Sequence, residues 1–254
     1  MLQELSEPRP YSTILPKVGH GNLVALFHEF RRIFHQAEYG MLKEGERDVS
    51  FFMLDPIHYG DQIQNIFDDG LAFQPILRTQ SLRGFVHSFI PAKPDQIAAY
   101  VGVVARDLET AKRFVEAFKK NDHTEVGKMF CYPECCVKAF LDYKTPDPIF
   151  EIAKGKTQIE NYNHLLQQHL RYWGPAIVPW FPCSFNCSES YDKARHWLDR
   201  LKKIDVTTTE KVLDILKQPS EWSLLNAQVL VKHPEFLGYA TSYYSAKKVM
   251  VRFA

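Results

Sequence analysis

Apolar positions recur along the chain at two spacings, that of a helix and that of a strand. From residue 22 to 43 they recur every three or four residues, which predicts an amphipathic helix with Asn22 as its N-cap. Residues 97–105 form a continuous apolar run typical of a buried strand. Residues 107–120 then show helical periodicity with an acidic start and a basic end. This strand–helix pair indicates a mixed sheet covered by helices.

The rest of the chain contains shorter elements of both kinds. We expect helices at residues 61–67, 160–173, 188–204 and 208–217, and extended runs at residues 50–54, 71–77, 84–90, 227–232 and 236–244. Residues 1–20 are rich in proline and are expected to be irregular. Because no repeat or low-complexity linker divides the chain, we expect a single α+β domain over residues 1–254.

The composition and charge of the chain indicate which binding partners and which cellular compartment to expect. Hydrophobic residues make up 45% and charged residues 24% of the 254 positions, and the formal net charge is +1. This balance gives no reason to expect nucleic acid or a membrane as a partner. No run approaches the roughly 20 apolar residues of a membrane span, and the first residues lack the pattern of a signal peptide. We therefore expect a cytoplasmic protein, in which cysteines bind metals or catalyse reactions more often than they form disulfides.

All five cysteines lie within one stretch of the chain, between residues 131 and 187. They form two groups, Cys131, Cys135 and Cys136 in the first and Cys183 and Cys187 in the second. Each group contains or follows a proline and leads into a predicted helix. Such clustering favours a shared site over scattered buried thiols.

Both groups are expected to lie at the start of a helix. Pro133 suits the first helical position, which places Cys135 and Cys136 in the first turn. Ser188 suits the N-cap of the later helix, so that Cys187 directly precedes it. Free N–H groups and the positive end of the helix dipole stabilise thiolates at such positions. We expect the two helix starts to converge on one site.

The adjacent cysteines Cys135 and Cys136 help to indicate which metal centre the site binds. Zinc sites usually take cysteines two to four residues apart, whereas neighbouring helical side chains diverge by about 100°. A cluster with several irons offers a separate iron to each thiolate. We therefore predict an iron–sulfur cluster, of the 4Fe-4S type, held by Cys135, Cys136, Cys183 and Cys187, with Cys131 as a further candidate ligand. A zinc site and a redox dithiol are the alternatives.

The residues around these cysteines resemble a known motif pair. The segment from Tyr132 to Phe140 and the segment from Pro182 to Ser188 resemble a prokaryotic family of unknown function. Its members carry a G-Y-P-x-C-C-x-x-x-F motif and a P-C-S-x-x-C motif. This chain has Cys131 where the first motif has glycine, which makes Cys131 the least expected ligand. The resemblance implies that the other four cysteines form one site, and it implies no reaction.

Few other residues stand out as candidates for chemistry. His123 precedes the first cysteine group and could act as a fifth ligand or as an acid–base group. Arg171, with Arg78 and Arg83, could hold an anionic substrate. Asp55, His58 and Asp61 form a small polar group that more commonly marks a plain turn, and the histidines His164, His169 and His196 have spacings that do not suit a metal site.

The size of the chain favours an enzyme over a bare electron carrier. We therefore expect an iron–sulfur protein that acts on a small molecule by Lewis-acid, redox or sulfur-transfer chemistry. The alternatives are a zinc-stabilised binding module without catalysis and a dithiol oxidoreductase that uses the cysteines directly.

Overall fold

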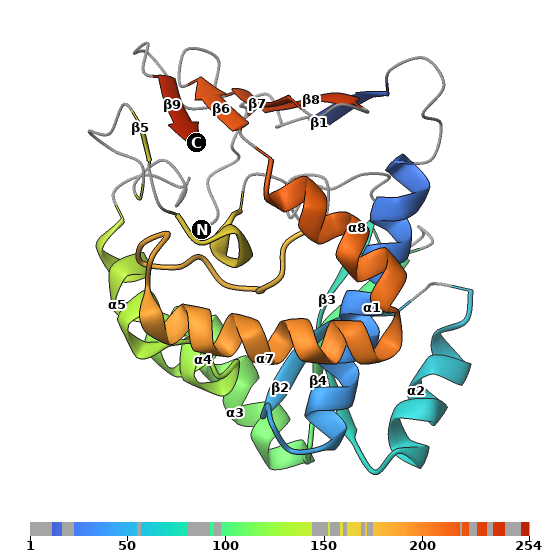
Figure 1. Cartoon of the computed structure of the whole chain (residues 1–254). Coiled ribbons are helices and arrows are strands. Elements are labelled where there is room, and N and C mark those ends of the chain that lie inside the picture. The colour runs from blue at the N-terminus through green and yellow to red at the C-terminus, as the bar shows by residue number, and fades with distance from the viewer. Residues whose placement is uncertain are drawn as a thin grey trace. The chain divides into compact units, whose positions relative to one another are not determined.

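The fold of the chain is known from a computed structural model, in which helices accompany two β-sheets (Figure 1). The structure describes residues 12–16, 23–54, 57–80, 92–93, 98–143, 152, 158–159, 162–168, 171, 175–218, 220–223, 228–232, 236–241 and 250–253. Its residues group into two compact units, one of residues 33–142 and one formed by the segments on either side. The α+β class predicted from the sequence is confirmed, and the single domain over residues 1–254 stays a prediction.

The unit of residues 33–142 is built on a three-stranded antiparallel sheet. Its strands are β2 (Val49–Leu54), β4 (Ala98–Ala105) and β3 (Ala72–Gln80), with β4 in the centre. The helices of this unit are the end of α1 (Leu23–Lys43), α2 (Tyr59–Asp68), α3 (Leu108–Lys119), α4 (His123–Met129) and α5 (Glu134–Asp142).

Both faces of this sheet are covered, which explains the continuous apolar run of its central strand. Side chains alternate across a strand. Val103 packs with Phe114 of α3 in one core cluster, whereas Val104 packs with Leu42 of α1 and Ile66 of α2 in another. Seven of the eight residues of β4 are buried. The pattern is that of a strand between two helical layers.

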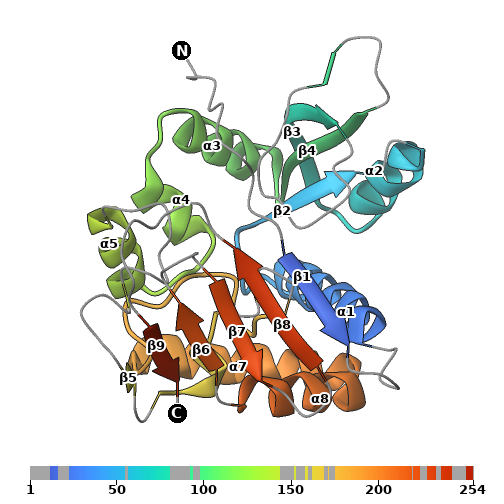
Figure 2. The same ribbon diagram turned by 90° about the horizontal axis from the view of Figure 1, so that it is seen from above.

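The other unit contains a six-stranded sheet, whose strands lie side by side in Figure 2 in the order β1-β8-β7-β6-β9-β5. The strands are β1 (Ser12–Pro16), β5 (Gln158–Ile159), β6 (Ser220–Ser223), β7 (Gln228–Lys232), β8 (Phe236–Thr241) and β9 (Met250–Phe253). The sheet is mixed, because β5 pairs with β9 in parallel and the remaining pairs are antiparallel.

Two consecutive helices of this unit meet at a single aspartate. α7 (Ser188–Ile204) ends and α8 (Val206–Leu216) begins at Asp205. The Asp205 carboxylate accepts hydrogen bonds from the Thr208 backbone N–H at 2.9 Å and from its hydroxyl at 2.8 Å. This N-cap lowers the pKa of Asp205 and fixes the turn between the helices.

Most predicted elements are present where the structure describes them, and two predictions are wrong. Within residues 160–173 the described part holds the short 3₁₀ helix η1 (His164–Leu166) and a further 3₁₀ residue, Arg171, and Gln167 after η1 is extended. Residues 165–168 are all buried, so no single face of a helix is involved. Residues 1–20 are not wholly irregular, because β1 pairs with β8. The predicted strand at residues 84–90 lies outside the described residues.

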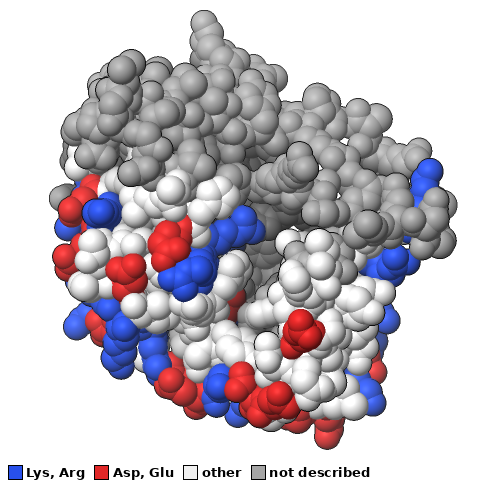
Figure 3. Space-filling view, turned by 90° about the vertical axis from the view of Figure 1, so that its right-hand side faces the viewer, with Lys and Arg blue, Asp and Glu red and all other residues white. Residues whose placement is uncertain are grey.

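The surface carries both signs of charge. Figure 3 shows acidic and basic side chains interspersed over the described part of the face it draws. This agrees with the net charge of +1. Among the described helices, none combines the length and the apolar character that crossing a bilayer requires.

Candidate metal centre

The first cysteine group follows a tight turn at the end of α4. The Cys131 N–H donates to the Lys128 carbonyl at 2.8 Å, and the Tyr132 N–H donates to the Gly127 carbonyl at 3.0 Å. Together these bonds form a Schellman motif, which favours glycine at its left-handed position. Cys131 occupies that position with φ of 58°. The backbone therefore favours glycine at the position that Cys131 occupies in this chain.

The helix that carries the adjacent cysteines begins directly after this turn. The Pro133 carbonyl accepts the first backbone bonds, from Cys136 and Val137, each at 3.0 Å. Helix α5 begins at Glu134, one residue later than the sequence predicts. Cys135 and Cys136 still fall in its first turn, as predicted, where backbone N–H groups lack helical acceptors.

The last cysteine is itself the N-cap of α7. The Cys187 sulfur accepts a hydrogen bond from the Ser190 backbone N–H at 3.4 Å. The prediction that Ser188 caps this helix is therefore wrong, because Ser188 is already the first helical residue. Ser190 also accepts a bond on its hydroxyl from the Trp180 indole N–H at 3.0 Å. One buried serine thus contacts both the cysteine sulfur and the loop before it.

The loop that bears Cys183 is held by an arginine. The Arg171 guanidinium donates to the Pro179 carbonyl at 2.7 Å and to the Gln168 side-chain oxygen at 3.0 Å. It also lies over the Phe181 ring, 4.4 Å from the ring centre. These contacts assign Arg171 a structural part in positioning the loop.

Four sulfur atoms lie together. Those of Cys135, Cys136, Cys183 and Cys187 are all within 4.8 Å of one another. The sulfurs of the adjacent pair, Cys135 and Cys136, are 3.8 Å apart. Cys136 and Cys187 are buried, and the other two are half-buried. The four residues predicted as ligands are thus brought together, and Cys131 is not a member of this group.

Three of the four cysteines lie at the start of a helix. Cys135 and Cys136 lie in the first turn of α5 and Cys187 caps α7, and at a helix start the backbone N–H groups interact favourably with a thiolate. Lys138 adds a cation on α5. Its hydrogen bond to Glu134 at 2.8 Å, and to a smaller degree the charge of Cys135, raises the pKa of Lys138.

The other candidates do not join the cysteine group in the described part of the chain. His123 is exposed at the start of α4, and its ring packs edge-on against Phe140, with ring centres 6.1 Å apart. The Arg78 guanidinium lies over the Tyr100 ring. His58 and Asp61 belong to no metal-binding group, and Asp55, Arg83 and His169 lie outside the described residues.

The contacts of Ser190 were not predicted from the sequence. Serines at positions 188 and 190 are equally suited to the start of a helix, and no local signal distinguishes a cap from a buried acceptor. The partner of Ser190, Trp180, lies ten residues earlier across a loop without regular periodicity.

Comparison with known proteins adds one match. A family model described as "Protein of unknown function (DUF483)" matches residues 110–217, a region that contains all five cysteines. The chain is therefore similar to an uncharacterised family there, in agreement with the resemblance seen in the sequence. No curated protein and no solved structure matches the chain. The class of protein defined by the fold and site is an α+β protein with a four-cysteine group that could bind a metal.

Proposed function

We propose that Cys135, Cys136, Cys183 and Cys187 bind a single zinc ion, and that this ion stabilises the fold of the segments carrying them. The donor set fits, since four thiolates are a common ligand set of structural zinc. The observation that carries the proposal is the mutual spacing of the four sulfurs.

The spacing of the sulfurs supports a single ion over a cluster. Thiolates arranged tetrahedrally about zinc, with Zn–S bonds of about 2.3 Å, stand about 3.8 Å apart. The two sulfurs of the adjacent pair are 3.8 Å apart, and every pair in the group is within 4.8 Å. Thiolates on the four corners of a 4Fe-4S cluster stand about 6 Å apart, because each sulfur lies on the outer side of its own iron. The separation of the adjacent pair is thus the one expected around a single tetrahedral ion, which supports zinc over the cluster.

Adjacent side chains on a helix diverge, which favours a cluster that offers each thiolate a separate iron. At the start of α5 that divergence does not keep the two sulfurs apart, because their separation of 3.8 Å equals the edge expected for one tetrahedral ion. Cys135 and Cys136 can therefore share one zinc ion although they are adjacent in sequence.

A closed ligand shell supports a structural role. Four protein thiolates would fill a tetrahedral site and leave no position for water or substrate. Catalytic zinc sites keep such a position open. Neighbouring residues would orient the thiolates. Ser190 donates its backbone N–H to the Cys187 sulfur, and Arg171 donates to the Pro179 carbonyl in the loop before Cys183.

Metal analysis tests the proposal. Protein purified without oxygen should be colourless and contain about one zinc per chain, with no acid-labile sulfide. Brown protein with near-equal iron and sulfide would instead establish the predicted iron–sulfur cluster. Metal-free folded protein whose thiols interconvert with a disulfide would support the dithiol alternative.

Substitution of each cysteine tests the ligand set. Changing any one of Cys135, Cys136, Cys183 or Cys187 to serine should lower zinc occupancy, and cobalt reconstitution should lose the visible bands of a tetrahedral four-thiolate site. Cys131→Ser is the matched control, because it removes a nearby thiol outside the group and should keep full occupancy. If any of the four variants retained the metal with an unchanged cobalt spectrum, the ligand set would be wrong.

A further inference from the structure

The two cysteines of the second group lie on one short turn. The Cys187 N–H donates to the Ser184 carbonyl at 3.3 Å, which folds back the segment that separates Cys183 from Cys187. Within the turn, the Phe185 carbonyl accepts a hydrogen bond from the Asn163 N–H at 3.0 Å, and the Phe185 side chain is buried. These contacts, none of which involves α5, hold the sulfurs of Cys183 and Cys187 within 4.8 Å of each other.

The two sulfurs differ in their access to solvent. Cys183 is half-buried, whereas Cys187 is only 8% exposed. The Cys187 sulfur accepts a hydrogen bond from the Ser190 N–H at 3.4 Å, and a backbone N–H at a helix start interacts favourably with a thiolate. A small oxidant therefore reaches Cys183 more readily than Cys187, and a second thiolate lies beside it.

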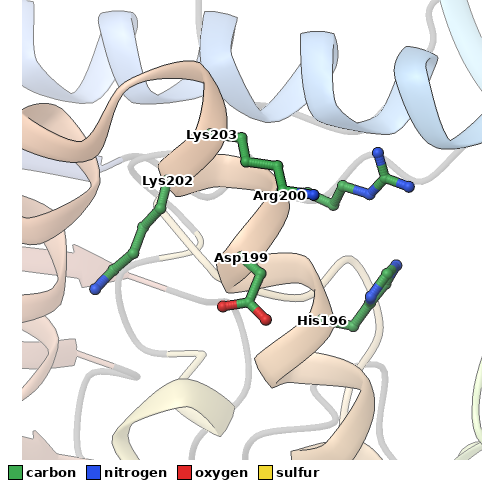
Figure 4. A pocket seen from close by; sticks show the side chains of 5 residues that line it. All are labelled: His196, Asp199, Arg200, Lys202 and Lys203. Carbon is green, nitrogen blue, oxygen red and sulfur yellow. The ribbon is translucent and has the colours of Figure 1, made fainter.

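The cavity on the second half of α7 lies apart from this pair along the helix. It has a volume of about 440 Å³, and no thiol is among its lining side chains, which are His196, Asp199, Arg200, Lys202 and Lys203 (Figure 4). His196 follows Cys187 by nine residues, which corresponds to about 14 Å along the helix axis. The half-buried Cys183, rather than this cavity, is therefore where an oxidant can meet the pair.

The adjacent cysteines Cys135 and Cys136 are poorly placed to form a disulfide with each other. Consecutive Cα atoms are about 3.8 Å apart across a trans peptide bond, whereas those of a disulfide are usually about 4.4–6.8 Å apart. Both residues also belong to the first turn of α5. By contrast, Cys187 has an extended backbone and Cys183 lies in a loop, so these two can reach bonding distance without unwinding a helix.

We propose that a peroxide oxidises Cys183 and Cys187 to a disulfide, and that this reaction releases the metal. The release depends on the zinc site proposed for the four cysteines. The Cys183 thiolate attacks one oxygen of hydrogen peroxide and breaks the O–O bond, which gives a sulfenic acid and hydroxide. The Cys187 thiolate then attacks the Cys183 sulfur, forms the S–S bond and expels a second hydroxide. The two thiolates lose two electrons, and the peroxide oxygens gain them.

This oxidation removes half of the ligand set. Cys135 and Cys136 remain as thiolates, whereas a structural zinc site takes four protein ligands. Zinc occupancy should therefore fall with each disulfide formed and return when a dithiol reductant regenerates the Cys183 and Cys187 thiolates. The pair would make the metal-supported fold sensitive to peroxide.

Peroxide titration of the zinc-loaded chain tests this regulation. The zinc content of the reduced protein is measured first and tests the proposed function by itself. Hydrogen peroxide should then release zinc, followed with a colorimetric chelator, in step with one disulfide per ion, and dithiothreitol should restore zinc binding. Zinc retained after disulfide formation, or zinc lost without a disulfide, would overturn the inference and leave the zinc site in place.

Tryptic mapping of the oxidised protein identifies the cysteines that pair. Cleavage after Arg171 and Lys193 gives a peptide of residues 172–193, which contains Cys183 and Cys187, whereas the other three cysteines lie in the peptide of residues 129–138. The proposed disulfide should lower the mass of the first peptide by that of two hydrogen atoms. A cross-link between the two peptides, or a disulfide within residues 129–138, would contradict the assignment.

Cys131→Ser is the matched control. It removes a half-buried thiol outside the group of four and should release zinc at the rate of the parent. Slower release would assign the attacking thiol to Cys131 and overturn the proposed pair. In Cys187→Ser, the sulfenic acid at Cys183 should persist and react with dimedone, whereas labelling at Cys135 instead would refute Cys183 as the first site of attack. Because Cys187→Ser also removes a proposed ligand, the mapping of the parent keeps the test decisive should this variant fail to fold.

Discussion

Four helices end on a residue with a left-handed backbone, and the residue type differs among them. α1, α2, α3 and α4 are followed by Gly45, Gly70, Asn121 and Cys131, with φ between 56° and 78°. Each of these residues takes part in the paired hydrogen bonds of a Schellman motif. Glycine and asparagine are the usual residues there, because other side chains are strained at positive φ. Cys131 is therefore the strained member of the set.

Relieving this strain should stabilise the protein. We expect Cys131→Gly to raise the free energy of unfolding by about 1 kcal/mol, because glycine tolerates positive φ without steric cost. Urea unfolding of the metal-replete protein measures the change. Cys131→Ala serves as the control, since alanine keeps the strained backbone and should give no such gain. A loss of stability in Cys131→Gly would mean that the cysteine side chain outweighs the strain.

Replacing the buried Ser190 should lower stability and zinc binding more than replacing the exposed Ser188 on the same helix. Ser190→Ala removes the acceptor of the Trp180 indole N–H, and a buried donor left without its partner costs about 1–3 kcal/mol. We expect lower stability and weaker zinc binding, measured by urea unfolding and by competition with a chelator. Ser188→Ala changes an exposed serine on the same helix and should have little effect. Equal effects of the two substitutions would contradict the assignment.

At the residue scale, the sequence predicted the four-cysteine group but not the contacts that support it. Cys135, Cys136, Cys183 and Cys187 could be selected because cysteine is rare and chemically distinct, so that clustering alone is informative. Ser190 could not be selected, because serine is common and its role depends on a buried indole ten residues away. Supporting contacts of this kind follow from tertiary packing, which residue spacing does not encode.

At the element scale, helices with one exposed face and the long buried strand β4 were predicted, whereas the short buried segment around η1 was not. The ranges of α7 and α8 follow from their amphipathic periodicity, because one side of each helix meets solvent. Around η1 the same reasoning failed, since residues 165–168 are all buried and their apolar content carries no directional pattern. Short strands such as β1 gave little periodic signal and depend on pairing with a distant strand.

The packing of α4 on α5 depends on a glycine. A Cβ atom built on Gly127 would lie 2.5 Å from one methyl carbon of Val137 and 3.1 Å from the other, so no simple movement of one methyl relieves the clash. Since α5 carries the adjacent cysteines on its first turn, this contact also sets the position of their sulfurs. We expect Gly127→Ala to lower the free energy of unfolding by about 1–3 kcal/mol and to weaken zinc binding.

The control for this substitution is another helical glycine. A Cβ atom added to Gly40 in α1 would have no neighbouring atom within 4 Å, so Gly40→Ala should stabilise the helix by about 0.5–1 kcal/mol. The double variant Gly127→Ala/Val137→Ala should recover part of the lost zinc affinity by removing the clash. Chelator competition on all three proteins provides the measurement. Unchanged zinc binding in Gly127→Ala would show that α4 does not position α5.

At the scale of the whole molecule, we expect stability in acid to depend on a buried ion pair. Glu38 and Arg47 are 3.0 Å apart, and the Arg47 side chain is only 1% exposed. Burial by itself would raise the pKa of Glu38, but the charge of Arg47, together with His35 and Ser50, lowers it below its ordinary value. The Arg47 guanidinium also lies over the Phe130 ring, at the end of α4. The pair thus joins α1 to the core of the unit of residues 33–142.

The lowered pKa of Glu38 fixes the sign of the pH dependence. A carboxylate whose pKa is lower in the folded state stabilises that state above its unfolded pKa, and the contribution is lost as the pH falls through the folded value. We expect the unfolding midpoint in urea to fall as the pH is lowered below about 4.5, and to fall less steeply in a Glu38→Gln/Arg47→Met double variant. Because both proteins keep the same four cysteines, proton competition with the metal cancels in the comparison. Parallel pH profiles for the two proteins would show that Glu38 does not carry this acid dependence.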